Sequence, residues 1–156
     1  MKNKKYELLK DDAITYFGRT LYRIKATTDF GDVKKGHLGG YIEKVENLSH
    51  DGNAWVYCNA EVSGNAKVYG NARVSDDACV SGNAWVSSSK DYIVFKNTWS
   101  SFRWFTYTKS NKMWKVGCFY GTGAELIAKA YEDSEISGKH YESYVNLVLE
   151  LEKIDG

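Results

Sequence analysis

The sequence predicts a mainly β protein in which a short β-solenoid is followed by an α+β module. Three observations indicate this fold class. Six hexads follow one another without a gap over residues 52–87, residues 92–120 contain ten aromatic side chains, and helical patterns begin after residue 121. At 156 residues, the chain has the length of one domain or of two small ones.

The hexads define the predicted solenoid. They read GNAWVY, CNAEVS, GNAKVY, GNARVS, DDACVS and GNAWVS, so alanine and valine recur while the residue between them varies. Because side chains alternate along a strand, alanine and valine should point inward and the variable residue outward. Gly-Asn tolerates positive φ and turns the chain between strands. With three hexads per coil, residues eighteen apart are stacked on one another, and the six hexads make two coils. Continuing the six-residue period toward the N-terminus places Ile42 and Leu48 at the position of the alanines, on the alanine track, in an irregular extra coil.

The hexads resemble the hexapeptide-repeat family, and this resemblance implies a left-handed parallel β-helix. The position after valine is usually small in that family, whereas Tyr57 and Tyr69 stand there in this chain. Many members are acyltransferases of several more coils, with a catalytic histidine between subunits. Only His50 lies near the hexads, so an acyltransferase is the least favoured functional hypothesis.

The segments before the hexads are expected to cap the solenoid, because a short stack exposes strand edges at both ends. Residues 13–17 and 20–24 are predicted strands around Gly18-Arg19, a two-residue hairpin signal. The expected organisation is an N-terminal β cap at 1–35, the solenoid at 36–89 and the α+β module at 90–156.

A three-stranded meander and two helices are predicted after the hexads. The strands are expected at 91–96, 102–108 and 113–120, with a hairpin turn at 109–112. Thr122 and Glu125 have the spacing of a capping box, which opens the first helix. The second helix is predicted to begin at Ser137. Cys118 is expected to be a small buried residue of the sheet.

Charge and cysteine content limit the classes of function. The formal net charge is +1, which indicates neither a uniformly basic nucleic-acid-binding protein nor an acidic DNA mimic. The charges are nevertheless distributed unevenly along the chain. Residues 91–120 carry five basic and one acidic side chain, and residues 121–156 carry three basic and eight acidic ones. The three cysteines form no Cys-x-x-Cys pair, so we expect a reduced compartment, no metal and no cofactor. No transmembrane helix or signal peptide is expected, because the apolar runs are only a few residues long.

A second resemblance covers most of the chain. Residues 21–26 (LYRIKA), 29–36 (DFGDVKKG) and 38–44 (LGGYIEK), followed by the hexads, are similar to small hexapeptide-repeat, or polymer-forming, proteins of bacteriophages and prophages. Residues 117–122 (GCFYGT) are similar to a C-terminal module that several of them share. The resemblance implies a phage accessory protein in the cytoplasm of the infected bacterial host, and it supplies no catalytic residue.

Aromatic and cationic side chains are the candidate partner-binding residues. The eighteen-residue stacking sets Trp55 beside Arg73 and Lys67 beside Trp85, as cation–π arrangements on two solenoid faces. Trp, Tyr and Arg dominate interface hot spots. The alternative is that the aromatic side chains pack on flanking segments or form a core in the C-terminal sheet. The candidates are Trp55, Tyr57, Lys67, Tyr69, Arg73, Trp85, Trp99, Arg103, Trp104, Lys112, Trp114 and Lys115.

The favoured function is that of a non-catalytic binding protein that inhibits or diverts a host protein or ribonucleoprotein. A bacterial defence factor is the expected target, which would make the chain an anti-CRISPR-like or other anti-defence protein, and a homodimer is expected. The alternative is a small-ligand binder that captures nucleotide signals in a basic aromatic pocket at a subunit or module boundary, and nucleic-acid binding stays open. An acyltransferase would show acetyl-CoA turnover that is lost on His50→Ala. No catalytic or metal-ligating residue is assigned.

Overall fold

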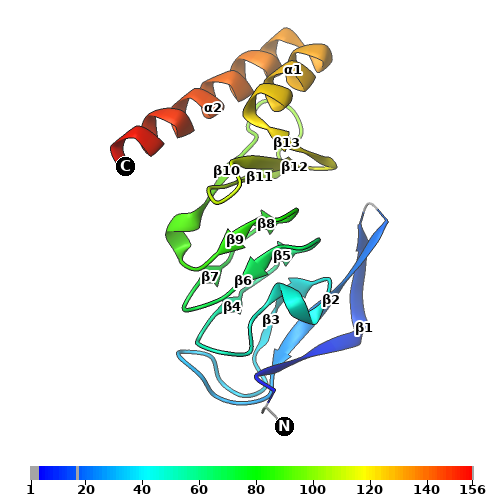
Figure 1. The fold of residues 1–156 in the computed structure, drawn as a ribbon. Helices are drawn as coiled ribbons and strands as arrows, with labels where there is room; N and C mark the ends of the chain where they lie inside the picture. Colours follow the sequence, from blue (N-terminus) through cyan, green and yellow to red (C-terminus); the bar gives the residue numbers. More distant parts are fainter. Residues whose placement is uncertain (1–3, 17, 156) are drawn as a thin grey trace.

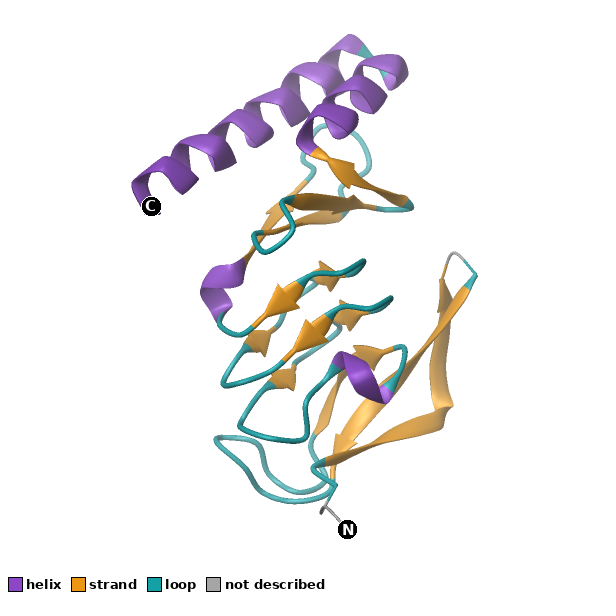
Figure 2. Ribbon diagram, in the orientation of Figure 1, coloured by secondary structure: helices purple, strands orange, loops and turns teal. Residues whose placement is uncertain are grey.

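A computed structural model describes residues 4–16 and 18–155. The hexads form short stacked strands in the middle of the molecule, and the N-terminal hairpin runs alongside them (Figure 1). An antiparallel sheet and two helices lie at the C-terminal end (Figure 2). No helix in these two ranges is long and apolar enough to cross a membrane.

A mixed sheet connects the N-terminal hairpin with the hexads. Its order is β1 (Tyr6–Tyr16), β2 (Arg19–Ala26), β3 (Leu38–Ile42), β5 (Glu61–Val62) and β8 (Cys79–Val80). The predicted hairpin forms, but Arg19 pairs with Tyr16 and so belongs to β2 rather than to the turn. Residue 17, which was assigned to the first strand, lies outside the described residues. A Cβ atom at Gly40 would lie 2.4 Å from the Ala60 carbonyl oxygen, so glycine lets β3 lie close to the hexads.

The other hexad strands form two parallel pairs. β4 (Trp55–Val56) pairs with β7 (Arg73–Val74), and β6 (Lys67–Val68) pairs with β9 (Trp85–Val86). The predicted pairing of residues eighteen apart is confirmed in all three cases, Trp55 with Arg73, Glu61 with Cys79 and Lys67 with Trp85.

The predicted fold class, a short left-handed parallel β-helix with capping modules, is wrong. In the described part of the chain, β4 to β9 belong to three separate small sheets, and no β-solenoid is formed. Each hexad contributes only two strand residues to these sheets. The N-terminal hairpin also draws β5 and β8 into its own mixed sheet.

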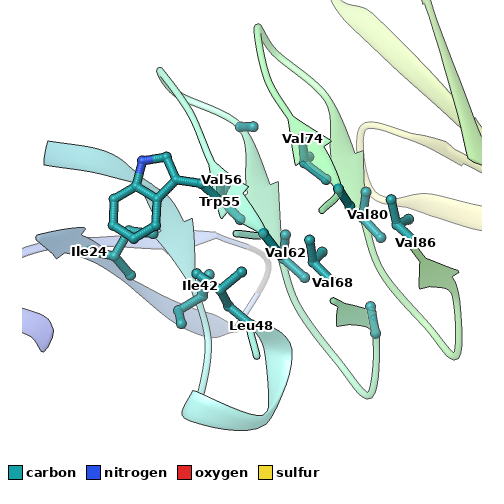
Figure 3. Close-up of a cluster of buried hydrophobic side chains, with 14 of the residues drawn as sticks. Ile24, Ile42, Leu48, Trp55, Val56, Val62, Val68, Val74, Val80 and Val86 are labelled. Carbon is teal, nitrogen blue, oxygen red and sulfur yellow. The ribbon is translucent and has the colours of Figure 1, made fainter. Parts of the chain in front are cut away.

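The alanines and valines of the hexads are buried, as their alternation predicts. The valines lie in rows that Ile42 and Leu48 extend (Figure 3). Ile42 pairs with Val62 and Leu48 with Val68, so both lie on the valine track, and their predicted place on the alanine track is wrong. The corner between Leu48 and Val56 holds two more residues than a hexad does, which accounts for the shift.

The first residue of every hexad adopts the left-handed conformation. Four of these residues are glycines with φ between 63° and 73°, but Cys58 (φ 56°) and Asp76 (φ 60°) adopt it too. A side chain is disfavoured in this conformation by about 1–2 kcal/mol. The turns predicted from Gly-Asn therefore form even where glycine is missing.

Replacing Cys58 by glycine is expected to raise the free energy of unfolding by about 0.5–1 kcal/mol. Glycine relieves the positive-φ strain, and its larger entropy in the unfolded chain offsets part of the gain. The Cys58 side chain is exposed, so no core contact is lost. Cys58→Ala is the matched control, because it removes the thiol but keeps the strain. Urea denaturation of the three proteins measures the effect, and an equal gain in both variants would contradict the explanation.

The C-terminal sheet has four strands, so the predicted three-stranded meander is wrong. They are β10 (Tyr92–Lys96), β11 (Trp104–Thr108), β12 (Met113–Val116) and β13 (Phe119–Thr122). A turn at Gly117 (φ 54°) and the exposed Cys118 divides the predicted third strand, so Cys118 is not buried as expected. β11 begins at Trp104 rather than at residue 102, because Phe102 has a φ of 59° that a strand does not accept.

Two helices follow the sheet, as predicted. α1 (Gly123–Asp133) begins with the expected capping box of Thr122 and Glu125. α2 (Glu135–Asp155) begins two residues before the predicted Ser137. Two short 3-10 helices, η1 (Val45–Asn47) and η2 (Ser89–Asp91), flank the hexads.

The C-terminal sheet covers the exposed edges of the last hexads. The Thr106 hydroxyl accepts a hydrogen bond of 2.9 Å from the Cys79 N–H, and the Ser110 hydroxyl accepts one of 2.8 Å from the Trp85 N–H. These hydroxyls satisfy backbone groups that another strand would otherwise pair. The opposite face of the sheet, with Phe105 and Tyr107, packs on the helices.

Candidate functional site

Two predicted binding residues are buried. Trp55 is fully buried among the rings of Tyr6 and Phe30, whose centroids lie 6.2 and 5.3 Å away. Trp114 is buried in the aromatic core between the C-terminal sheet and the helices. The expected exposed face at Trp55 is therefore wrong, because the N-terminal segment covers it.

Arg73 and Tyr57 make their contacts within the chain. The Arg73 guanidinium lies 2.7 Å from the Asp32 carboxylate and 5.5 Å from the centroid of the Tyr57 ring. The Tyr57 hydroxyl also donates a hydrogen bond of 3.0 Å to Asp32. These hydrogen bonds hold the pKa of Asp32 below its usual range. The predicted stacking of Arg73 on Trp55 is thus replaced by contacts with the loop that carries Asp32.

The basic hairpin and the acidic helix neutralise one another. Lys112 lies 3.2 Å from the carboxylate of Glu152, and Lys109 lies 3.0 Å from that of Asp155. Trp99 stacks on His140 with 4.2 Å between ring centroids and donates its indole N–H to Ser137. Lys112 and Trp99 therefore contact α2, so these two candidate binding residues interact within the chain.

Three of the predicted residues form an exposed group on the hexads, which we name the Trp85 surface: Lys67, Tyr69 and Trp85. Trp85 is 55% exposed and Tyr69 is 40% exposed, and Lys67 pairs in register with Trp85. Val68 and Val86 are buried beneath them, so this surface rests on the hydrophobic core.

A second exposed group, the Trp104 surface, surrounds the start of β11 and consists of Lys96, Phe102, Arg103 and Trp104. Phe102 is 63% exposed and Trp104 is 41% exposed, with the Lys96 ammonium 5.7 Å from the Trp104 ring centroid. The sequence pattern indicated Arg103 and Trp104 but not Lys96 and Phe102. Lys96 ends a strand that pairs with Trp104, and alternation alone does not indicate their proximity.

Lys115 lines a cavity that the sequence did not reveal, which we name the Lys115 cavity. Its volume is about 250 Å³. Its floor is the outward side of β5 and β8, and its walls are β2 and the hairpin of β12 and β13. The lining residues are Arg19, Leu21, Glu61, Ser63, Cys79, Ser81, Gly82, Lys115, Cys118 and Tyr120.

Burial perturbs the titratable groups of the Lys115 cavity. Loss of solvent raises the pKa of Glu61 and lowers that of Lys115, while each charge favours the ionised form of the other. Burial also raises the pKa of the Cys79 thiol to about 12. Groups with perturbed pKa values that meet in a cavity are typical of ligand sites.

His50, the histidine nearest to the hexads, packs against the N-terminal strand. Its ring stacks on Tyr6 with 4.1 Å between centroids, and its Nδ1 accepts a hydrogen bond of 3.0 Å from the Lys5 N–H. Within residues 4–16 and 18–155, no group of three His, Cys, Asp or Glu side chains could hold a metal ion. No protein-family model matches the chain, and no curated protein sequence matches it.

Proposed function

We propose that the chain is a non-catalytic binding protein that inhibits or diverts a host protein or ribonucleoprotein through the Trp85 surface. The observation that carries the proposal is the exposure of more than half of the Trp85 side chain. Exposed aromatic residues beside cations supply much of the affinity in protein interfaces.

The backbone of the Trp85 surface is held in place before any partner binds. Trp85 donates its N–H to Ser110, and the N–H groups of Lys67 and Tyr69 donate to the carbonyl oxygens of Ala84 and Val86. A surface fixed in this way loses little conformational entropy on association. The rigid backbone favours a binding role for Trp85. A structural role is less favoured, because the exposed Trp85 side chain is not part of the hydrophobic core.

The proposed biological setting is the cytoplasm of a bacterium infected by a phage, with a defence factor as the target. Its support is the resemblance of residues 21–26, 29–36 and 38–44, and of the hexads, to phage accessory proteins. A homodimer is part of the proposal, and the exposed Leu147 and Ile154 of α2 support it. Val148 of the same helix is buried in the core that the helices form with the C-terminal sheet.

Trp85→Ala and Lys67→Glu are expected to reduce capture of the host partner at least tenfold. The immobilised chain is exposed to lysate of a phage-sensitive bacterium, and the captured components are quantified by mass spectrometry. Trp104→Ala is the matched control, because Trp104 is a similarly exposed tryptophan on another surface. We expect the wild type and Trp104→Ala to capture the same macromolecule at unit stoichiometry. Undiminished capture by both Trp85→Ala and Lys67→Glu would contradict the proposed surface.

The alternative, capture of a nucleotide signal, requires a basic aromatic pocket at a subunit or module boundary. The Lys115 cavity lies between segments of the chain and contains Arg19, Lys115 and Tyr120. Its volume of about 250 Å³ is small beside the sites of roughly 300–1,000 Å³ that hold drug-sized ligands. The carboxylate of Glu61 would also oppose part of the attraction between a phosphate group and the two cations, so the cavity favours a different ligand class.

A further inference from the structure

The Lys115 cavity is built by three segments that are distant in the sequence. Arg19 and Leu21 come from β2, and Glu61, Ser63, Cys79 and Ser81 come from the outward side of the hexads. Lys115, Cys118 and Tyr120 come from the C-terminal hairpin. The cavity therefore exists only in the folded chain, and none of its walls belongs to the Trp85 surface.

Two cations and one carboxylate meet in this cavity. Burial lowers the pKa of Lys115, the Glu61 charge raises it and the Arg19 charge lowers it, and the three side chains line one cavity. Arg19 also forms an ion pair of 2.8 Å with Glu43, but a guanidinium has five N–H donors and retains others for a ligand. A ligand in this small cavity would therefore lie close to both positively and negatively charged side chains.

A buried hydroxyl in the cavity lining has no hydrogen-bond partner in the described part of the chain. It is the Ser81 Oγ, which follows β8 directly. An unpaired buried hydroxyl costs about 1–3 kcal/mol, and rotation of the Ser81 side chain into the cavity would let a polar ligand atom remove this cost. The hydroxyl can donate to a carboxylate or accept from an ammonium.

We propose that the Lys115 cavity binds a small zwitterion, the chemical class of free amino acids. The ligand carboxylate lies toward Lys115 and Arg19, the ligand ammonium lies toward Glu61, and Ser81 supplies a further hydrogen bond. A simple anion would complement Lys115 and Arg19 but not Glu61, and a simple cation would complement Glu61 but not the two cations. A molecule with both charges offers an opposite charge to Lys115, Arg19 and Glu61 alike, and the volume suits a ligand of this size.

Alkylation of the native cysteines tests occupancy without altering the chain. Cys118 is exposed and lines the cavity, whereas Cys58 is exposed but lies outside it. Cys79 is a poor nucleophile, because its pKa of about 12 keeps the thiol protonated at neutral pH. A bound amino acid is expected to slow iodoacetamide labelling of Cys118 at least fivefold and to leave Cys58 unchanged. Equal labelling of Cys118 with and without each of the twenty amino acids would overturn the proposal.

Thermal unfolding with matched probes tests the ligand class. Each amino acid is compared with its deaminated acid and with its amide, which remove one charge each. At about a hundred times its Kd, a zwitterion should raise the Tm by roughly 5 °C or more, and its single-charge analogues should not. Glu61→Gln and Lys115→Met should each weaken binding at least tenfold, while Lys67→Met on the Trp85 surface should bind as the wild type does. Equal binding of the deaminated acids, or unchanged binding by both cavity variants, would overturn the proposal.

Discussion

Replacing Trp55 by alanine is expected to destabilise the protein by about 3–5 kcal/mol. The indole is fully buried beside the Tyr6 and Phe30 rings, so its removal loses apolar burial and leaves a large cavity. A domain of this size is stable by only about 5–15 kcal/mol, so the loss is a large share of the total. The Tm should fall by roughly 6–20 °C.

Trp85→Ala is the matched control for this prediction. Trp85 occupies the same position of an identical Gly-Asn-Ala-Trp-Val sequence but is 55% exposed, so its replacement should cost less than about 1 kcal/mol. Denaturant unfolding of both variants measures the difference. Equal destabilisation would show that the N-terminal segment does not cover Trp55 in solution.

The two tryptophans show what the hexads could and could not predict. The six-residue period predicted the pairing of residues eighteen apart and the inward alanines and valines, because these follow from local alternation. Burial of Trp55 depends on Tyr6 and Phe30, which lie far away in the sequence. Identical pentads cannot distinguish the two environments.

The errors in the predicted fold have similar causes. The period fixed which hexad strands pair, but it did not show that two-residue strands stay in separate sheets or that β5 and β8 join the hairpin. The turn at Gly117 interrupts an aromatic run that alternation had indicated as one strand. The capping box before α1 was predicted correctly, because it is formed by two residues three apart in the sequence.

The candidate sites depend on tertiary structure to different degrees. Lys67 and Trp85 were predicted together, because the repeat alone places them in register. The repeat also placed Glu61 beside Cys79, but the cavity above them needs β2 and the C-terminal hairpin. The pairing of Lys67 with Trp85 follows from the sequence period, whereas the Lys115 cavity arises only when distant segments fold together.

Between pH 7 and 9.5, the Lys5 side chain is expected to make the folded state more stable by about 2 kcal/mol. Lys5 is buried, with its ammonium 2.6 Å from the Ala54 carbonyl oxygen and 4.7 Å from the Phe30 ring centroid. Burial lowers its pKa from 10.5 to about 8, although the nearby Asp51 charge acts in the opposite direction. Above pH 8 the folded state therefore binds fewer protons at Lys5 than the unfolded state does, and a rise in pH favours folding until about pH 10.5.

Comparison with Lys5→Met isolates this contribution. Other groups also make the free energy of unfolding depend on pH. The pKa of Lys115 is lowered in the folded state, so Lys115 stabilises the fold as the pH rises. The pKa of Cys79 is raised, so Cys79 destabilises the fold as the pH rises. The gap in the free energy of unfolding between the wild type and Lys5→Met should therefore shift by about 2 kcal/mol in favour of the wild type between pH 7 and 9.5. Lys4→Met, at an exposed neighbouring lysine, should show no such shift. A constant gap for Lys5→Met would mean that the ammonium is solvated in the folded state, and the N-terminal segment would then not seal the core around Trp55.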